Sequence, residues 1–266
     1  MRERGNRLAN LFLRYASFFA ELRRVPVLGD FLSWTGRMLL PRDTLVWIQI
    51  QHGPAEGLWI RVNPRTGQNV QQGIGEPQVQ QALVNYLRPG MTFYDLGANI
   101  GYFSLIAARL VGPTGRVVSF EADPEIAARL RENLARNNFS HARVEQKAVW
   151  SGVTTVSFAR VDPHTSPDRG LGHVCADSSG DTITVKAISL DSYVTPQNSP
   201  DFLKCDVEGA EAEVFRGAER LLAERRTILL VEMHNTNNHR TLAQKFVNLG
   251  CTVRNLDENH VLALPK

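Results

Sequence analysis

Apolar side chains near the N-terminus recur at the spacing of one helical face. Between positions 8 and 22, seven apolar residues lie three, four or seven positions apart, which predicts an amphipathic helix. Aromatic residues on one side and basic residues on the flanks are compatible with a helix that lies on a membrane surface. The same stripe is typical of a helix packed on its own domain or on a second subunit. Peripheral membrane contact and homo-oligomer formation through residues 8–22 therefore both stay open.

Alternating polar and apolar positions come next. Residues 44–52 and 58–62 alternate on either side of a Gly-Pro turn and predict a β-hairpin. Residues 63–75 are polar and turn-rich, and a helix is predicted from Pro77, at its first position, to Leu87. We divide the chain into an extension of helix and hairpin, residues 1–72, and a main domain, residues 73–266.

Short apolar runs and helical stretches alternate through the main domain. The strands expected at 91–96 and 117–120 flank a helix, and together they predict a β-α-β unit. The further elements expected are helix 124–137, strand 142–146, strands 153–159 and 182–188, strand 201–206, a helix from 209 and strand 228–231. This order predicts an α/β fold whose ligand crevice lies at the carboxyl ends of the strands.

An insertion at about 150–190 interrupts this alternation with a hairpin and a loop. Residues 160–181 within it are rich in Pro, Gly, Ser and Asp, and a loop of this length is often a lid or a binding loop. It carries four polar residues that either contact a substrate or are simply solvated: His164, Asp168, Arg169 and His173.

Composition narrows the class of protein. Of the 266 residues, 43% are hydrophobic and 21% are charged, which is typical of a globular chain. The net charge of +3 is uneven, because eight Arg and three acidic residues give residues 1–42 a net charge of +5 and leave −2 for the rest. That balance disfavours a nucleic-acid partner for the main domain. Three widely spaced cysteines and no long apolar run lead us to expect a cytoplasmic protein, with peripheral membrane association as the alternative.

Candidate chemistry begins at the first strand of the β-α-β unit. Asp95 ends that strand, Gly97, Asn99 and Gly101 form the turn, and Glu121 follows the second strand, where an acid can accept both ribose hydroxyls. The third glycine of a dinucleotide fingerprint and the lysine of a phosphate-binding loop are both missing. The acid beside the turn would repel a pyrophosphate but suits the cationic S-adenosylmethionine. We therefore predict S-adenosylmethionine as the cofactor.

The sequence resembles a known family. Its motifs are Phe93-Tyr94-Asp95-Leu96-Gly97-Ala98-Asn99-Ile100-Gly101-Tyr102-Phe103-Ser104, Phe120-Glu121-Ala122-Asp123-Pro124, Leu190-Asp191-Ser192-Tyr193, Leu203-Lys204-Cys205-Asp206-Val207-Glu208-Gly209-Ala210-Glu211 and Leu230-Val231-Glu232-Met233-His234. Over residues 73–235 they look like those of FkbM-type methyltransferases. The resemblance implies a class I Rossmann-like fold with a seven-stranded, mostly parallel sheet and S-adenosylmethionine as methyl donor. It also implies methylation of a hydroxyl group and a cofactor site that includes Ala122 and, beside the adenine, Ala148.

The second half of the domain supplies the candidate catalytic groups. Asp206 ends one buried strand, while Glu232 and His234 end the next, so all three are expected at the same rim. His234 can act as the general base, because the pKa of an unperturbed imidazole, about 6.5, lies near the working pH. Alternatively, Asp206, Glu208 and Glu232 can bind Mg²⁺ and lower the pKa of the acceptor hydroxyl. Lys204, on the same side of its strand as Asp206, either takes part in catalysis or only neutralises buried charge.

Several other functions compete with O-methylation of a small molecule, sugar or glycan. A nucleic-acid base methyltransferase is disfavoured, because Asp206-Val207-Glu208-Gly209 stands where an Asn/Asp-Pro-Pro-aromatic motif would be expected. An NAD-dependent oxidoreductase is disfavoured by Asn99 in the glycine turn. N-methylation, carboxyl methylation and a non-catalytic nucleotide-binding module stay as alternatives within the same fold.

Overall fold

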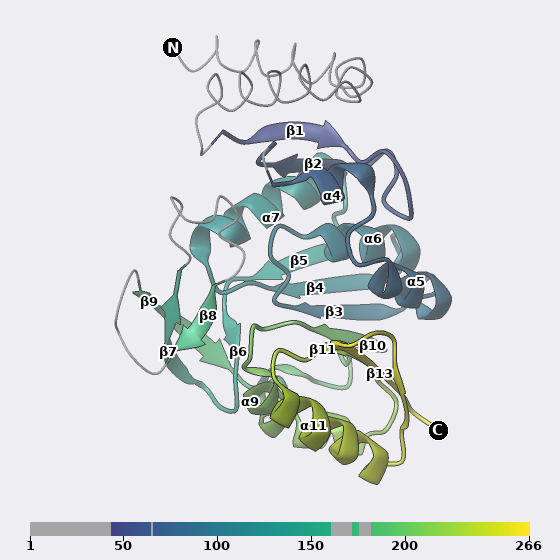
Figure 1. Cartoon of the computed structure of the whole chain (residues 1–266), viewed down its shortest axis with the longest axis vertical. Helices are drawn as coiled ribbons and strands as arrows, with labels where there is room; N and C mark the ends of the chain where they lie inside the picture. The colour runs from purple at the N-terminus through teal and green to yellow at the C-terminus, as the bar shows by residue number, and fades with distance from the viewer. Residues whose placement is uncertain (1–43, 65, 161–171, 176–181) are drawn as a thin grey trace, which may run out of the picture.

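The computed structural model describes residues 44–64, 66–160, 172–175 and 182–266 (Figure 1). The helix expected at 8–22 lies outside these residues, as do His164, Asp168 and Arg169. No helix of the described ranges has the length and apolarity that crossing a membrane requires.

A seven-stranded sheet forms the centre of the molecule. Its order is β12-β13-β11-β10-β3-β4-β5, and all neighbours are parallel except at β13, which runs antiparallel to both β11 and β12. The strands are β3 (Thr92–Leu96), β4 (Arg116–Phe120), β5 (Ala142–Glu145), β10 (Phe202–Cys205), β11 (Ile228–Glu232), β12 (Thr252–Asn255) and β13 (His260–Leu264). This is the expected class I Rossmann-like sheet, and the ends of β3, β4, β10 and β11 meet at one edge.

Helices cover both faces of the sheet (Figure 1). One face carries α5 (Pro77–Tyr86), α6 (Tyr102–Val111) and α7 (Pro124–Arg136), and the other carries α8 (Leu190–Tyr193), α9 (Glu211–Arg216), α10 (Glu219–Ala223) and α11 (Thr236–Asn248). Strand residues alternate between the faces, so Phe93 joins the hydrophobic core under α6 and Tyr94 joins the core on the opposite side. One helix was expected after Gly209, but the structure has two, α9 and α10. They are separated at Gly217, which packs tightly against the backbone of Trp150.

The predicted hairpin is present as β1 (Val46–Gln49) and β2 (Trp59–Val62). It packs on α7, whose asparagines accept hydrogen bonds from its backbone: Trp59 N–H donates to Asn137 and Arg61 N–H donates to Asn133, each at 2.8 Å. A short helix, α4 (Gln68–Gln72), occupies part of the stretch that was expected to be turns. The boundary placed at residue 72 stays a prediction.

The insertion forms a second sheet beside the carboxyl edge of β4 and β5 (Figure 1). The two strands expected there are β7 (Thr154–Ala159) and β9 (Thr182–Ile188), which pair antiparallel. They are joined by β6 (Ala148–Val149) and by β8 (His173–Cys175), which lies within the expected loop.

Candidate functional site

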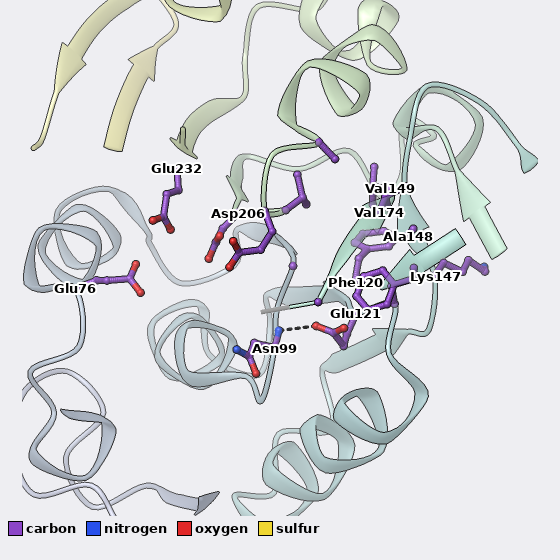
Figure 2. Close-up of a pocket in the computed structure, with 17 residues that line it drawn as sticks. Glu76, Asn99, Phe120, Glu121, Lys147, Ala148, Val149, Val174, Asp206 and Glu232 are labelled. Atoms are coloured by element: carbon purple, nitrogen blue, oxygen red, sulfur yellow. Dashed lines mark hydrogen bonds between the residues drawn. The ribbon is translucent and has the colours of Figure 1, made fainter. Parts of the chain in front are cut away.

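A cavity of about 250 Å³ opens at the carboxyl edge of the central sheet, between that edge and the inserted sheet (Figure 2). Eight of the residues singled out from the sequence line it: Gly97, Asn99, Glu121, Ala122, Ala148, Asp206, Glu208 and Glu232. The other four, Asp95, Gly101, Lys204 and His234, lie beneath or beside it.

The glycine turn brings β3 close to its neighbours. Gly97 has φ +74°, and a Cβ there would lie 1.7 Å from the carbonyl oxygen of Asp206. Gly101 has φ +90°, and a Cβ there would lie 2.1 Å from Leu130. Gly97 has no room for a side chain, because the carbonyl oxygen is backbone and cannot turn aside. The Leu130 methyl group can move, so at Gly101 it is the left-handed backbone that favours glycine. The turn therefore presents backbone to the cavity.

Glu121 joins the turn to the end of β4. Asn99 N–H donates to Oε2 of Glu121 at 2.9 Å (Figure 2). Asp123 N–H donates to Oε1, also at 2.9 Å. The side chain is buried, with 8% exposure, and burial raises the pKa of Glu121 to about 7. Each oxygen keeps one acceptor site for a ligand in the cavity.

Asp95 points into the protein rather than into the cavity. Ser104 Oγ donates to Oδ2 of Asp95 at 2.5 Å, and the residue is 1% exposed. Burial raises its pKa, and the Lys204 ammonium, 3.9 Å from Oδ1, opposes that rise. The parallel register of β3 and β10 places Lys204 directly beside Asp95. Asp95 therefore supports the turn from below.

Lys204 connects this buried acid with the rim. Its Nζ donates to Oδ2 of Asp206 at 2.9 Å and lies 5.0 Å from the centre of the Phe103 ring. Burial lowers the pKa of Lys204, but Asp206 and Asp95 together outweigh burial and raise it overall. Lys204 is thus a buried cation, and its ion pair with Asp206 holds the pKa of that carboxyl below its usual range despite burial.

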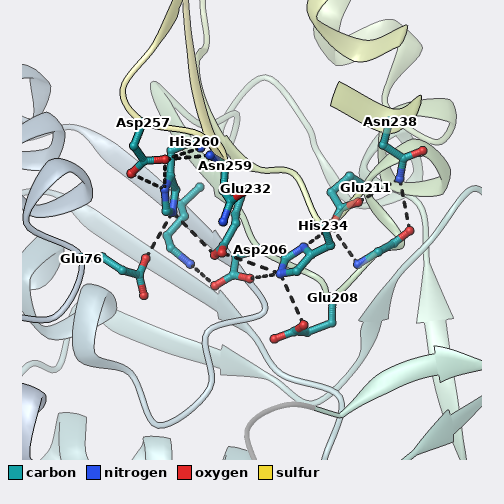
Figure 3. Close-up of polar contacts among 12 residues, drawn as sticks. Glu76, Asp206, Glu208, Glu211, Glu232, His234, Asn238, Asp257, Asn259 and His260 are labelled. Atoms are coloured by element: carbon teal, nitrogen blue, oxygen red, sulfur yellow. Dashed lines mark hydrogen bonds and ion pairs between the residues drawn. The ribbon is translucent and has the colours of Figure 1, made fainter. Parts of the chain in front are cut away.

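His234 lies beyond Asp206, among carboxylates (Figure 3). Its Nδ1 is 2.7 Å from Oε1 of Glu211, and its Nε2 is 3.3 Å from Glu208 and 3.7 Å from Asp206. The hydrogen bond to Glu211 is the largest cause that raises the pKa of His234 to about 9, against burial. His234 is therefore protonated at neutral pH, and it can accept a proton at Nε2 only after losing its own.

Glu211 orients this imidazole. It is fully buried, and its carboxylate also accepts hydrogen bonds from Gly209 N–H at 2.8 Å and from the Asn238 amide at 3.0 Å. Burial raises the pKa of Glu211, but these donors and His234 outweigh burial and lower it. The sequence alone does not indicate this role of Glu211, because an acidic residue in the first turn of a helix is equally well explained by the helix dipole.

A second histidine lies on the other side of Glu232 and was missed in the sequence. His260, at the start of β13, has its Nε2 3.6 Å from Glu232 and 3.4 Å from Glu76, and its Nδ1 2.9 Å from Asp257 (Figure 3). Burial lowers the pKa of His260, but the three carboxylates raise it to about 10. Only the topology brings these residues together, because Glu76 precedes α5 and His260 lies 184 positions later.

The inserted sheet supplies the other wall of the cavity, and its contribution was also missed. Phe158, Gly172 and Val174 line the cavity, and Phe158 belongs to the same apolar cluster as Ala122 and Ala148. At the end of β7, Arg160 is fastened to the main domain by an ion pair of 2.7 Å with Asp123, which also caps α7. His173, on β8, is exposed and does not line the cavity.

Comparisons with known proteins agree on one class of enzyme. One relative is the 31-O-demethyl-FK506 methyltransferase FkbM from Streptomyces tacrolimicus. It is 30% identical to this chain over 179 residues, and the match covers 57% of this chain and 68% of that protein. The hexuronic acid methyltransferase AglP from Haloferax volcanii is 28% identical over 162 residues, 60% of this chain and 63% of that protein. Three other curated methyltransferases match over 57–78 residues, and the chain spans 17–35% of their length.

A crystal structure of a methyltransferase FkbM from Methylobacillus flagellatus aligns with 74% of this chain and 57% of that one, at 17% identity and a TM-score of 0.48. The family model described as the methyltransferase FkbM domain matches residues 95–252, from the strand that carries Asp95 to the start of β12. The chain belongs to the FkbM methyltransferase family.

Proposed function

We propose that this chain transfers a methyl group from S-adenosylmethionine to a hydroxyl group of a small molecule, sugar or glycan. The observation that carries the proposal is the cavity. The buried carboxylate of Glu121 lies on one wall, and further carboxylates lie at the edge beside the imidazole of His234, which Glu211 orients. Family membership supports the reaction class.

The residues present fit the donor. Gly97 and Asn99 line the cavity, so a ligand bound there would contact the glycine turn. Glu121 has acceptor sites left for two ribose hydroxyls, and the acids of the cavity suit a ligand with an ammonium and a sulfonium group. Apolar contacts from Ala148 and Phe158 suit the adenine. When bound, S-adenosylmethionine supplies a methyl group that is already activated for displacement.

The protein must hold the acceptor and take its proton. Asp206, Glu208 and Glu232 line the cavity and can accept hydrogen bonds from hydroxyl groups. Glu211 fixes the His234 ring so that Nε2 faces this rim. In its neutral form His234 then accepts the hydroxyl proton at Nε2.

The names of two relatives indicate the acceptor class. One relative is named for 31-O-demethyl-FK506 and the other for hexuronic acid. We extend to this chain only the shared chemical class, a hydroxyl-bearing small molecule or sugar. A nucleic-acid acceptor is not part of the proposal.

Assistance by Mg²⁺ is the alternative to base catalysis at this rim. The three carboxylates expected to bind it are Asp206, Glu208 and Glu232, and all of them line the cavity. Among the described residues of this rim, the group whose ligand atoms lie within 4.8 Å of one another is Asp206, Glu232 and His234, in which a ring nitrogen stands in place of the Glu208 oxygen. Chelation followed by the return of Mg²⁺ alone separates the alternatives, because base catalysis survives chelation and assistance by Mg²⁺ is restored only by that ion.

The test is an acceptor screen with isotopically labelled S-adenosylmethionine, using hydroxyl-bearing sugars and natural products. Once an acceptor is found, His234→Gln should lower kcat by about 10²–10⁴-fold and leave the Kd of the donor unchanged. His52→Gln, an exposed histidine in the hairpin turn, is the matched control. Calorimetry that detects no donor binding to the wild-type chain would reject the proposal at its first step.

A second part of the proposal concerns residues 8–22 and where the enzyme is located. We expect a cytoplasmic enzyme whose N-terminal helix covers apolar surface of its own domain, of a second subunit or of a membrane. Deleting residues 1–24 should change solubility or oligomeric state and keep the donor Kd, which sedimentation and calorimetry measure. A truncated protein that is unchanged in solubility and oligomeric state rejects this role.

A further inference from the structure

His260 has one ring nitrogen aimed at two carboxylates without a hydrogen bond to either. The residue is 6% exposed, and within the described part of the chain its Nε2 has no hydrogen-bond partner. Oε2 of Glu76 lies 3.4 Å away and Oε2 of Glu232 lies 3.6 Å away. A hydrogen bond between such groups spans about 2.7–3.2 Å. Both separations are longer.

The two separations leave room for an ion shared between the three groups. Two ligands about 2.1 Å from one metal ion, at a tetrahedral angle, lie about 3.4 Å apart. The three ligand atoms of Glu76, Glu232 and His260 all lie within 4.8 Å of one another. They come from three separate elements, namely the residue before α5, the end of β11 and the start of β13.

The other nitrogen of His260 is held as in a metal-binding histidine. Both oxygens of Asp257 lie 2.9 Å from Nδ1, and Asp257 is itself fixed by the backbone N–H groups of Asn259 and His260. A carboxylate on Nδ1 places that proton away from the metal side and orients Nε2 toward the ion.

We propose that Glu76, Glu232 and His260 bind one divalent transition-metal ion, of the class of Zn²⁺ or Mn²⁺. One imidazole and two carboxylates suit such ions, whereas Mg²⁺ and Ca²⁺ select oxygen ligands alone. The group around His234 is the poorer site, because Lys204 already donates to Oδ2 of Asp206 at 2.9 Å. No lysine or arginine of the described residues pairs with Glu76 or Glu232, whose neighbours of basic character are His260 and, for Glu232, also His234 at 3.8 Å.

The ion would lie in the wall of the cavity described above. Glu76 and Glu232 both line that cavity, so an ion bound by them would lie next to it (Figure 2). An open position next to three protein ligands is the arrangement of catalytic metal sites. An acceptor hydroxyl bound there would lose its proton more readily. This role rests on the proposed function, whereas the binding of the ion does not.

Metal binding by the full chain tests the site directly. The protein is stripped with a chelator and dialysed against Zn²⁺ or Mn²⁺, and bound metal is counted by mass spectrometry. We expect one ion per chain, and at least tenfold weaker binding in Glu76→Gln and His260→Gln. Asp257→Asn should weaken binding about 10–100-fold through the orientation of His260. His52→Gln and Glu132→Gln, two exposed positions away from the cavity, should bind as the wild type does.

Specific outcomes overturn the proposal. It is wrong if the wild-type chain binds no stoichiometric ion below millimolar concentration, or if His234→Gln loses the ion while Glu76→Gln keeps it. Circular dichroism checks that each variant folds. Glu76 and Asp257 are partly exposed, so their variants decide the matter if His260→Gln does not fold. All of these readouts are independent of methyl transfer, so failure of the ion to bind and failure to find an acceptor are separate results.

Discussion

Lowering the pH should weaken the binding of S-adenosylmethionine, because Glu121 then takes up a proton. Burial raises the pKa of Glu121 to about 7. Each carboxylate oxygen already accepts a backbone N–H, from Asn99 or from Asp123. Only the charged form therefore keeps an acceptor site on each oxygen for the two ribose hydroxyls. Protonation would place a hydrogen where the ligand needs an acceptor.

The size of the effect follows from the pKa. A ligand that binds only the charged form loses about tenfold in affinity for each pH unit below the pKa of the free protein. With the pKa of Glu121 at about 7, we expect the Kd at pH 6 to be about tenfold above the Kd at pH 8. Calorimetric titration between pH 5.5 and pH 8 measures the change. Parallel titration with 5′-methylthioadenosine, which keeps the ribose but lacks the amino and carboxyl groups, excludes ionisation of the ligand as the cause.

A variant connects the pH dependence to one side chain. Glu121→Gln should remove the dependence and raise the Kd at pH 8, since a hydrogen bond to a charged group contributes about 1.5–3 kcal/mol. Glu132→Gln, an exposed carboxylate on α7, should keep the wild-type dependence. The reasoning is refuted if the wild-type Kd is the same at pH 6 and pH 8, or if the dependence persists in Glu121→Gln.

Three further outcomes are expected. Gly97→Ala should lower the melting temperature and abolish donor binding, because its Cβ would collide with the Asp206 carbonyl. In the control Gly57→Ala the Cβ meets nothing within 4 Å, so the free energy of unfolding should fall only by the roughly 1 kcal/mol of a left-handed backbone. Equal losses of stability in thermal denaturation would contradict this reasoning. Since the pKa of His234 is raised to about 9, base catalysis should make kcat rise with pH up to about 9, and a kcat that is constant between pH 7 and 9.5 argues against His234 as the base. The pKa of His260 is raised to about 10, so in metal-free protein its stabilising charge is fully present below about pH 6.5 and is lost as the pH rises through 10. The melting temperature should accordingly fall between pH 8 and pH 10.5, and fall less in His260→Gln.

Local pattern was enough to predict the parallel strands and the residues at their ends. Glu121 and Asp206 each follow a short apolar run, and the carboxyl ends of parallel strands meet at one edge. The structure confirms the class I sheet, and it places both residues in one cavity. Whether they bind donor and acceptor stays a proposal.

Other parts of the site depend on contacts that no local pattern encodes. Glu76 stands before a helix and His260 begins the last strand, so nothing in either neighbourhood indicates that they meet. The pKa of His234 depends on Glu211, which lies 23 positions earlier and is fully buried only in the folded chain. Phe158 is expected in a strand and Val174 in the loop 160–181, and only the position of the inserted sheet brings them to the cavity.

The contact between Gly97 and the carbonyl of Asp206 has a consequence for redesign. It sets the spacing between the turn proposed to hold the donor and the strand end proposed to hold the acceptor, and it does so through main-chain atoms alone. Side chains around the acceptor can therefore be exchanged without altering that spacing. An engineer who wants a new acceptor should vary the rim and the inserted sheet, and should leave this pair of backbone segments as the fixed frame of the enzyme.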